Sequence, residues 1–319
     1  MKRIVLVSIL VLISVLVFSA PKYDIRYGGQ YYPEEFLLKG YDFFSEVGIS
    51  VDHFIFSSGT ENNLALISGN IDVSVASDSK SVALFNSMGN EVLIIGVVQR
   101  GDRYSTIVKA DSNYNSWYDL KGKKVGTRFG TGADFVLKKF FESIPDLSWD
   151  DFQWINISPE DMISTLASGQ IDAFTVWAPT GEICVAQGIG RSIRSYGDIA
   201  LTPVLIHTSK KFAYANRELL VKFIAAHLKK AELIETDPQL ASEYAAKAAK
   251  DMGINIASGA FLLIFERIDF SLDFDEAIID ELRSTAEFLY NEGSISKVPE
   301  FYYDTTFIQE ARELLKSEE

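Results

Sequence analysis

The residue types that carry most enzyme chemistry are few in this chain and are widely spaced. Its histidines are His53, His207 and His227, and Cys184 is its single cysteine. No histidine lies within metal-ligand spacing of another histidine or of Cys184. The sequence contains no Gly-x-Ser-x-Gly elbow and no Gly-Lys-Ser/Thr phosphate loop. We therefore expect no enzyme activity, no metal, no cofactor and no intrachain disulfide, and instead a protein that binds a ligand.

Three pairs of neighbouring carboxylates are the remaining candidates for acid–base chemistry. They are Glu34-Glu35, Asp150-Asp151 and Asp280-Glu281. Each pair stands where a helix is expected to begin or to face solvent, and negative charge is favourable at the start of a helix. We interpret all three pairs as helix starts or solvated faces.

Hydrogen-bond donors and aromatic rings gather in loops that lead into helices. Gly130-Thr131-Gly132-Ala133 opens one helix and Ser57-Ser58-Gly59-Thr60 another. Free N–H groups there suit an anionic or strongly accepting group, although each loop taken singly is equally a helix cap. Together they have the usual composition of a small-ligand cleft. The predicted ligand-binding residues are Gln30, Tyr31, Ser58, Gly59, Thr60, Ser77, Asp78, Thr131, Gly132, Ala133 and Trp177.

The elements that must position these loops are repeated along the chain. Residues 66–72 and 166–172 are identical at five of seven positions, one hundred residues apart. Each segment reads as a helix end, a glycine in the left-handed position, and then an apolar strand. Upstream of both segments lie two short strand-like runs, and apolar helices are expected at 36–44 and 135–141. Each half of the repeat is therefore predicted to be β-loop-α-β-loop-α-β.

Alternating strands and helices predict mostly parallel sheets flanked by helices, with ligand bound beyond the carboxyl ends of the strands. We expect a two-lobed α/β protein in which residues 21–100 and 203–319 form lobe 1 and residues 101–202 form lobe 2. The final part of the chain is predicted to be mostly helical. Helices are expected from Asp237-Pro238 to Gly253, over 273–291, and after Asp304.

Composition and charge narrow the class of partner. The chain has 319 residues, of which 47% are hydrophobic and 23% charged, which suits about two globular domains. Its formal net charge of -14 argues against nucleic acid and anionic lipid as partners, because a protein that binds either one needs a basic surface.

Residues 1–20 have the pattern of a secretory signal. Lys2 and Arg3 precede an apolar run at 4–18, and Ser19-Ala20 supplies small residues before Pro21. A helix of that apolar length covers about 22 Å, short of the roughly 30 Å hydrocarbon layer. We expect cleavage near Ser19 or Ala20 and a periplasmic protein, with a retained N-terminal anchor as the alternative.

Taken together, the motifs resemble those of the periplasmic solute-binding proteins of ABC importers, in the nitrate/sulfonate/taurine and thiamine-precursor group. The resemblance covers the whole mature chain. Its residues are Ile25-Arg26-Tyr27-Gly28, Lys39-Gly40-Tyr41, Ala65-Leu66, Ser68-Gly69, Ile71-Asp72, the run from Asp119 to Gly126, the run from Ser168 to Ala173, Trp177-x-Pro179 and Asp304-x-x-Phe307-Ile308.

The resemblance implies a type II-like binding-protein fold whose lobes close around ligand on a two-crossover hinge. It places Arg100 at that hinge and the eleven predicted ligand-binding residues in the cleft. The implied partners are a small-molecule ligand and a membrane permease with its ATPase; no nucleic acid is expected, and the protein is expected to be a monomer. The related pyrimidine synthases of thiamine biosynthesis use a cysteine-rich motif that this chain lacks.

The ligand and the alternative function stay open at this point. A sulfonate, taurine or nitrate suits the Ser/Thr/Gly loops. An aminopyrimidine suits Tyr31, Tyr32 and Trp177 for stacking, with Asp78 or Glu61 accepting from its amine. These two acids oppose a bare anion if they point into the cleft, which slightly disfavours nitrate. The alternative function is a secreted enzyme or a ligand-sensing receptor on the same scaffold.

Overall fold

Two five-stranded sheets organise the chain. In the computed structural model, which describes residues 23–318, the strands of the first sheet are β1 (Ile25–Gln30), β2 (Val51–Phe56), β3 (Val73–Ser77), β4 (Val92–Gln99) and β10 (Val204–Ser209). Those of the second are β5 (Tyr104–Lys109), β6 (Lys124–Thr127), β7 (Gln153–Asn156), β8 (Ala173–Trp177) and β9 (Gly190–Ser195). The strand orders are β2-β1-β3-β10-β4 and β7-β6-β8-β5-β9.

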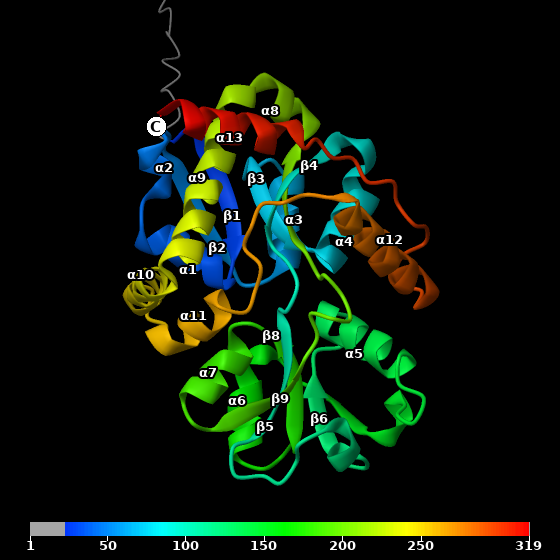
Figure 1. Cartoon of the computed structure of the whole chain (residues 1–319). Coiled ribbons are helices and arrows are strands. Elements are labelled where there is room, and N and C mark those ends of the chain that lie inside the picture. The colour runs from blue at the N-terminus through cyan, green and yellow to red at the C-terminus, as the bar shows by residue number, and fades with distance from the viewer. Residues whose placement is uncertain (1–22, 319) are drawn as a thin grey trace, which may run out of the picture.

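In each sheet four strands run in one direction, and only β10 or β5 runs the other way. The predicted fold class, two lobes of mostly parallel sheet flanked by helices, is confirmed. We call the part around the first sheet lobe 1 and the part around the second lobe 2 (Figure 1).

Helices cover both sheets, and most of them belong to lobe 1. Lobe 2 has α5 (Gly132–Glu142), α6 (Pro159–Ala167) and α7 (Thr180–Ala186). Lobe 1 has α1 (Pro33–Gly40), α2 (Phe43–Glu46), α3 (Gly59–Ile67), α4 (Asp78–Met88), α8 (Lys210–Ala215), α9 (Arg217–Thr236), α10 (Pro238–Asp251), α11 (Ser258–Phe265), α12 (Glu276–Asn291) and α13 (Thr306–Glu318). Short 3-10 turns are at η1 (Gly89–Glu91), η2 (Trp117–Leu120) and η3 (Trp149–Asp151).

The repeated segment has the same structural role in both lobes: it ends a helix and then joins two strands. Gly69 follows α3 with φ 72° and Gly169 follows α6 with φ 74°, so each helix ends in the left-handed glycine expected from the sequence. The aspartate after each glycine then joins two strands. Asp72 Oδ2 accepts from the backbone N–H of Arg26, and Asp172 Oδ2 accepts from that of Lys124, at 2.9 and 3.0 Å.

Three predictions from the sequence are wrong in detail: the helix at 36–44, the pair Glu34-Glu35, and the pair Asp280-Glu281, of which Glu281 is buried within α12 rather than at a helix start or on a solvated face. The apolar run at 36–44 is not one helix, because α1 ends at Gly40, and Asp42 caps the separate helix α2 by accepting from the Ser45 N–H. A Cβ at Gly40 would lie 2.2 Å from the Tyr244 carbonyl oxygen, so the close approach of α10 requires glycine there.

Glu34 and Glu35 do begin a helix, but both are fully buried rather than solvated. Glu35 accepts from the Tyr27 hydroxyl at 2.5 Å and lies 2.8 Å from His53 Nε2. Burial raises the pKa of Glu34 to about 8, although the buried Lys230 ammonium acts in the opposite direction. These acids therefore belong to a polar cluster inside lobe 1.

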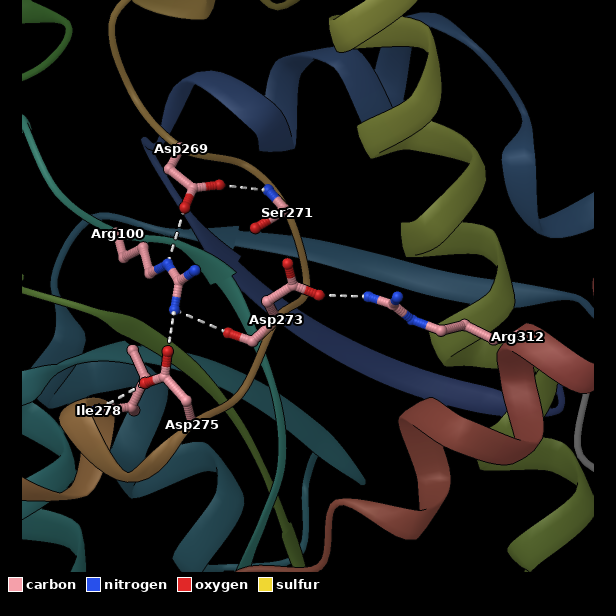
Figure 2. Close-up of polar contacts among 7 residues, drawn as sticks. All are labelled: Arg100, Asp269, Ser271, Asp273, Asp275, Ile278 and Arg312. Atoms are coloured by element: carbon pink, nitrogen blue, oxygen red, sulfur yellow. Dashed lines mark hydrogen bonds and ion pairs between the residues drawn. The ribbon is translucent and has the colours of Figure 1, made fainter.

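The chain crosses between the lobes twice, from β4 to β5 and from β9 to β10. Arg100, the residue placed at the hinge by the resemblance, lies in the first crossing. Figure 2 shows its guanidinium against the linker between α11 and α12: Nε donates to Asp269 at 2.7 Å, and Nη1 donates to the Asp273 carbonyl at 2.9 Å and to Asp275 at 3.3 Å. The crossing is thus tied to a third segment of lobe 1.

Among the helices of residues 23–318, none has both the length and the apolar character needed to cross a membrane. The predicted signal segment and its cleavage near Ser19 or Ala20 lie outside the described residues.

Asn62 offers a test of how α3 holds the sheet. Its buried Nδ2 donates to the carbonyl oxygens of Gly28 in β1 and Val75 in β3, both at 2.9 Å. We expect Asn62→Ala to lower the free energy of unfolding by about 1–3 kcal/mol, because it removes these bonds inside the protein. Urea unfolding followed by circular dichroism measures the change. The exposed Asn70, replaced by alanine, is the control; an equal effect of both variants would contradict this role.

Candidate functional site

The edges of the two sheets at which strands end and helices begin meet at the junction between the lobes (Figure 1). Asp78 begins α4 directly after β3, and Gly132 begins α5 after β6. A Cβ built at Gly132 would lie 3.7 Å from Asp78 Oδ1, so these two starts approach each other across the junction. The candidate ligand site is therefore the region where strand ends of both lobes converge.

Ion pairs and aromatic contacts hold the lobes together on two sides of this site. On one side, α5 meets α12: Lys138 lies 2.8 Å from Glu292, Lys139 lies 3.4 Å from Glu281, and the rings of Phe135 and Phe288 are 4.9 Å apart. On the other side, Arg267 after α11 lies 2.6 Å from Glu182 of α7. The lobes are thus in contact as a closed pair.

Arg103 lies at the centre of the junction and is almost completely buried. Its guanidinium carbon is 5.4 Å from the Tyr32 ring centroid of lobe 1 and 5.6 Å from that of Tyr104 in lobe 2. Nε donates to Gln99 Oε1 at 3.2 Å, and Nη1 donates to the Thr202 carbonyl at 2.6 Å. One cation thereby contacts both crossings and an aromatic ring from each lobe.

Asp78 is fully buried, and both of its carboxylate oxygens are engaged. Oδ1 accepts from the Ser79 N–H at 2.7 Å, and Oδ2 accepts from the Thr285 hydroxyl of α12 at 3.2 Å. Burial raises the pKa of Asp78, while the Arg103 charge and these hydrogen bonds oppose that rise. Glu61, the second acid considered from the sequence, is exposed and accepts from the Ser57 hydroxyl at 2.7 Å. Asp78 is thus fully engaged within the protein, whereas one oxygen of the exposed Glu61 is bonded to Ser57.

Several predicted site residues do come together on lobe 1. Gln30 is buried and donates from Nε2 to the Val75 carbonyl at 2.9 Å, which leaves its Oε1 near the start of α3. A Cβ at Gly59 would lie 3.1 Å from that oxygen. Ser77 immediately precedes α4, beside Asp78. Gln30 and Gly59 are thus close together, and Ser77 lies at the end of β3, the strand beside β1.

The other predicted residues either bond within their own loops, are exposed, or pack inside their own lobe. The Ser58 hydroxyl accepts from the Glu61 N–H at 3.3 Å and caps α3, and the Thr131 hydroxyl donates to the Arg128 carbonyl at 2.6 Å. Tyr31 and Thr60 are exposed, and Ala133 is buried in the first turn of α5. Trp177 is half-buried and packs against both hydrophobic clusters of lobe 2. A direct role of these side chains in ligand binding stays a prediction.

Sequence reasoning missed Lys80, Arg103 and Thr285. Lys80 lies two residues beyond Asp78, in the first turn of α4, and the cluster of donors and aromatics that marks this helix start in the sequence does not include it. Arg103 lies in the crossing between β4 and β5, where no sequence motif marks it. Thr285 is 207 positions from Asp78, so no local sequence pattern reveals their contact. Within residues 23–318 no group of three or more His, Cys, Asp or Glu side chains is arranged to hold a metal ion.

This arrangement defines a class: the two-lobed fold of periplasmic binding proteins. The crystal structure of the periplasmic aliphatic sulphonate binding protein of Escherichia coli matches with a TM-score of 0.73 and 19% identity, over 86% of this chain and 94% of that chain. A desulfurization enzyme matches with a TM-score of 0.69 and 15% identity, over 91% of this chain and 99% of that chain. At these identities the likeness establishes the fold alone.

The family model described as NMT1/THI5 like matches residues 37–241, and the chain belongs to this family. The resemblance drawn from the motifs is thereby confirmed. A relative from Brucella abortus (strain 2308), named only as a binding protein, is 31% identical over 132 residues, which are 41% of this chain. The chain spans 40% of the length of that relative in the match.

The ion pair between Arg267 and Glu182 gives a test of lobe closure. We expect Arg267→Ala to increase the radius of gyration of the unliganded protein, because it removes a contact made only when the lobes meet. Small-angle X-ray scattering measures this change. Arg283→Ala is the matched control, since Arg283 pairs with Glu276 and Asp280 inside α12 alone. Identical scattering from both variants would show that the pair does not hold the lobes closed.

Proposed function

We propose that the protein is the extracytoplasmic binding component of an ABC importer. It captures a small polar organic solute between its lobes and delivers that solute to a membrane permease driven by an ATPase. The observation that carries this proposal is the meeting of helix-opening loops from both lobes at Asp78 and Gly132, with ion pairs between the lobes on either side. Family membership supports the same function. A periplasmic location and a monomeric state belong to this proposal.

The solute class that we propose is an organic sulfonate such as taurine. Asp78, the buried acid that would accept from an aminopyrimidine amine, already accepts with both carboxylate oxygens, from Ser79 and Thr285. The similar Escherichia coli protein is named as an aliphatic sulphonate binding protein, which supports this choice. The positive ends of the helix dipoles at the starts of α3 and α5 favour an anionic group on the solute.

An enzyme on this scaffold is the second candidate, because a desulfurization enzyme has a similar fold. The single cysteine is a poor nucleophile here: Cys184 is buried on α7, and burial raises the pKa of its thiol to about 11. The geometry therefore favours binding over turnover.

A thermal-shift panel tests the proposed function. Purified protein is heated with taurine, ethanesulfonate, nitrate or an aminopyrimidine. We expect a sulfonate to raise the melting temperature by several degrees, because a ligand at 100 times its Kd adds about 2.7 kcal/mol to the free energy of unfolding. Mass spectrometry of solute released from native protein identifies the physiological ligand independently.

The same samples distinguish binding from catalysis. After prolonged incubation, we expect chromatography and mass spectrometry to recover the added solute unchanged. A protein that converts the solute would be an enzyme on this scaffold. A protein that none of the four compounds stabilises would not be a binding protein for these solute classes.

A further inference from the structure

Lys80 lies at the ligand-facing end of lobe 1, in the first turn of α4. A Cβ built at Gly59 would lie 2.7 Å from Lys80 Cγ, so the Lys80 stem crosses the start of α3. The side-chain amide of Asn63 donates from Nδ2 to the backbone carbonyl of Lys80 at 2.8 Å and fixes the backbone at this point. Gln30 Oε1 borders the same glycine. Lys80 therefore lies where the ends of β1, β2 and β3 converge.

No carboxylate of residues 23–318 forms an ion pair with the Lys80 ammonium. Across the described part of the chain it makes no hydrogen bond and no ion pair, although it is half-buried. Burial lowers the pKa of Lys80, and no neighbouring carboxylate acts against that shift. Lys138 and Lys139, by contrast, each contact a glutamate of α12 at the edge of the junction. A partly desolvated cation without a partner favours the binding of an anion.

The internal repeat shows that this charge belongs to one lobe. Asp78-Ser79-Lys80 follows β3, and Ala178-Pro179-Thr180 follows β8 at the interval of one hundred residues. Lobe 2 thus has threonine where lobe 1 has lysine. At this position of the repeat, therefore, lobe 1 offers a cation and lobe 2 does not.

The acids at the starts of α3 and α4 do not cancel the charge. Within residues 23–318 neither Asp78 nor Glu61 forms an ion pair with Lys80, and no carboxylate contributes to the shift of the Lys80 pKa. Both acids instead accept hydrogen bonds from uncharged groups, Asp78 from Ser79 and Thr285 and Glu61 from Ser57. We propose that Lys80 is the specificity-determining residue of the cleft, and that it receives the compact anionic head group of the solute, a sulfonate or a carboxylate. This inference rests on the proposed binding function.

Isothermal titration with matched probes tests the proposal. The probes are ethanesulfonate, propionate and the uncharged ethyl methyl sulfone. The proteins are wild type, Lys80→Met, Lys80→Arg and the control Lys247→Met, which changes an exposed lysine of α10. We expect Lys80→Met to weaken binding of the preferred anion at least tenfold, Lys80→Arg to weaken it less, and the control to bind like wild type. The sulfone should bind weakly to all four proteins.

A second measurement separates a binding role from a structural one. The melting temperature of unliganded Lys80→Met should equal or exceed that of wild type, because the variant removes a desolvated charge that no protein group stabilises. Affinity of Lys80→Met within twofold of wild type, equal binding of sulfone and ethanesulfonate, or a melting temperature several degrees lower would overturn the proposal.

The outcomes also separate this inference from the function on which it rests. Wild-type protein that binds an aminopyrimidine but neither anion would keep the binding function and reject the role of Lys80. Wild-type protein that binds neither the anions nor any compound of the thermal panel would reject both. A preference for propionate over ethanesulfonate, with the same dependence on Lys80, would support the role and identify the head group as a carboxylate.

Discussion

The buried guanidinium of Arg103 is the interaction on which the arrangement of the lobes depends. A charge removed from water is costly unless other groups replace its hydration, and here those groups come from both lobes and both crossings. Tyr32 and Tyr104 flank it, while Gln99 and the Thr202 carbonyl accept from it. Gln99 donates in turn to Glu34, whose carboxyl lies near buried Lys230. The lobe junction is thereby coupled to the core of lobe 1.

Two kinds of charge therefore operate at the junction. Charges with partners, such as Lys138 with Glu292 and Arg267 with Glu182, hold the lobes together. In the described part of the chain the Lys80 charge has no partner, and the stem of Lys80 lies across the start of α3. A binding protein needs both, because closure must be favourable while the site keeps some interaction energy for the solute.

Much of the fold was predictable because its determinants are local. The repeated Ser-Gly-x-Ile-Asp places a left-handed glycine and a strand-joining aspartate at fixed positions, and Asp237-Pro238 starts α10 as expected. Two errors came from long-range packing. Gly40 ends α1 where α10 approaches, and Glu34 and Glu35 are buried beneath distant elements that the periodicity of their own helix does not show.

The sequence by itself determined the two-lobed α/β class, the helix-opening loops and the family resemblance, because periodicity, caps and left-handed glycines act within a few residues. Only the tertiary structure decided which of those loops meet and which charged groups there have partners. Asp78 is engaged by Thr285, from the far end of the chain, while Lys80 beside it stays unpaired. The charge of a cleft depends on pairing between distant segments, and that pairing exists only once the chain has folded.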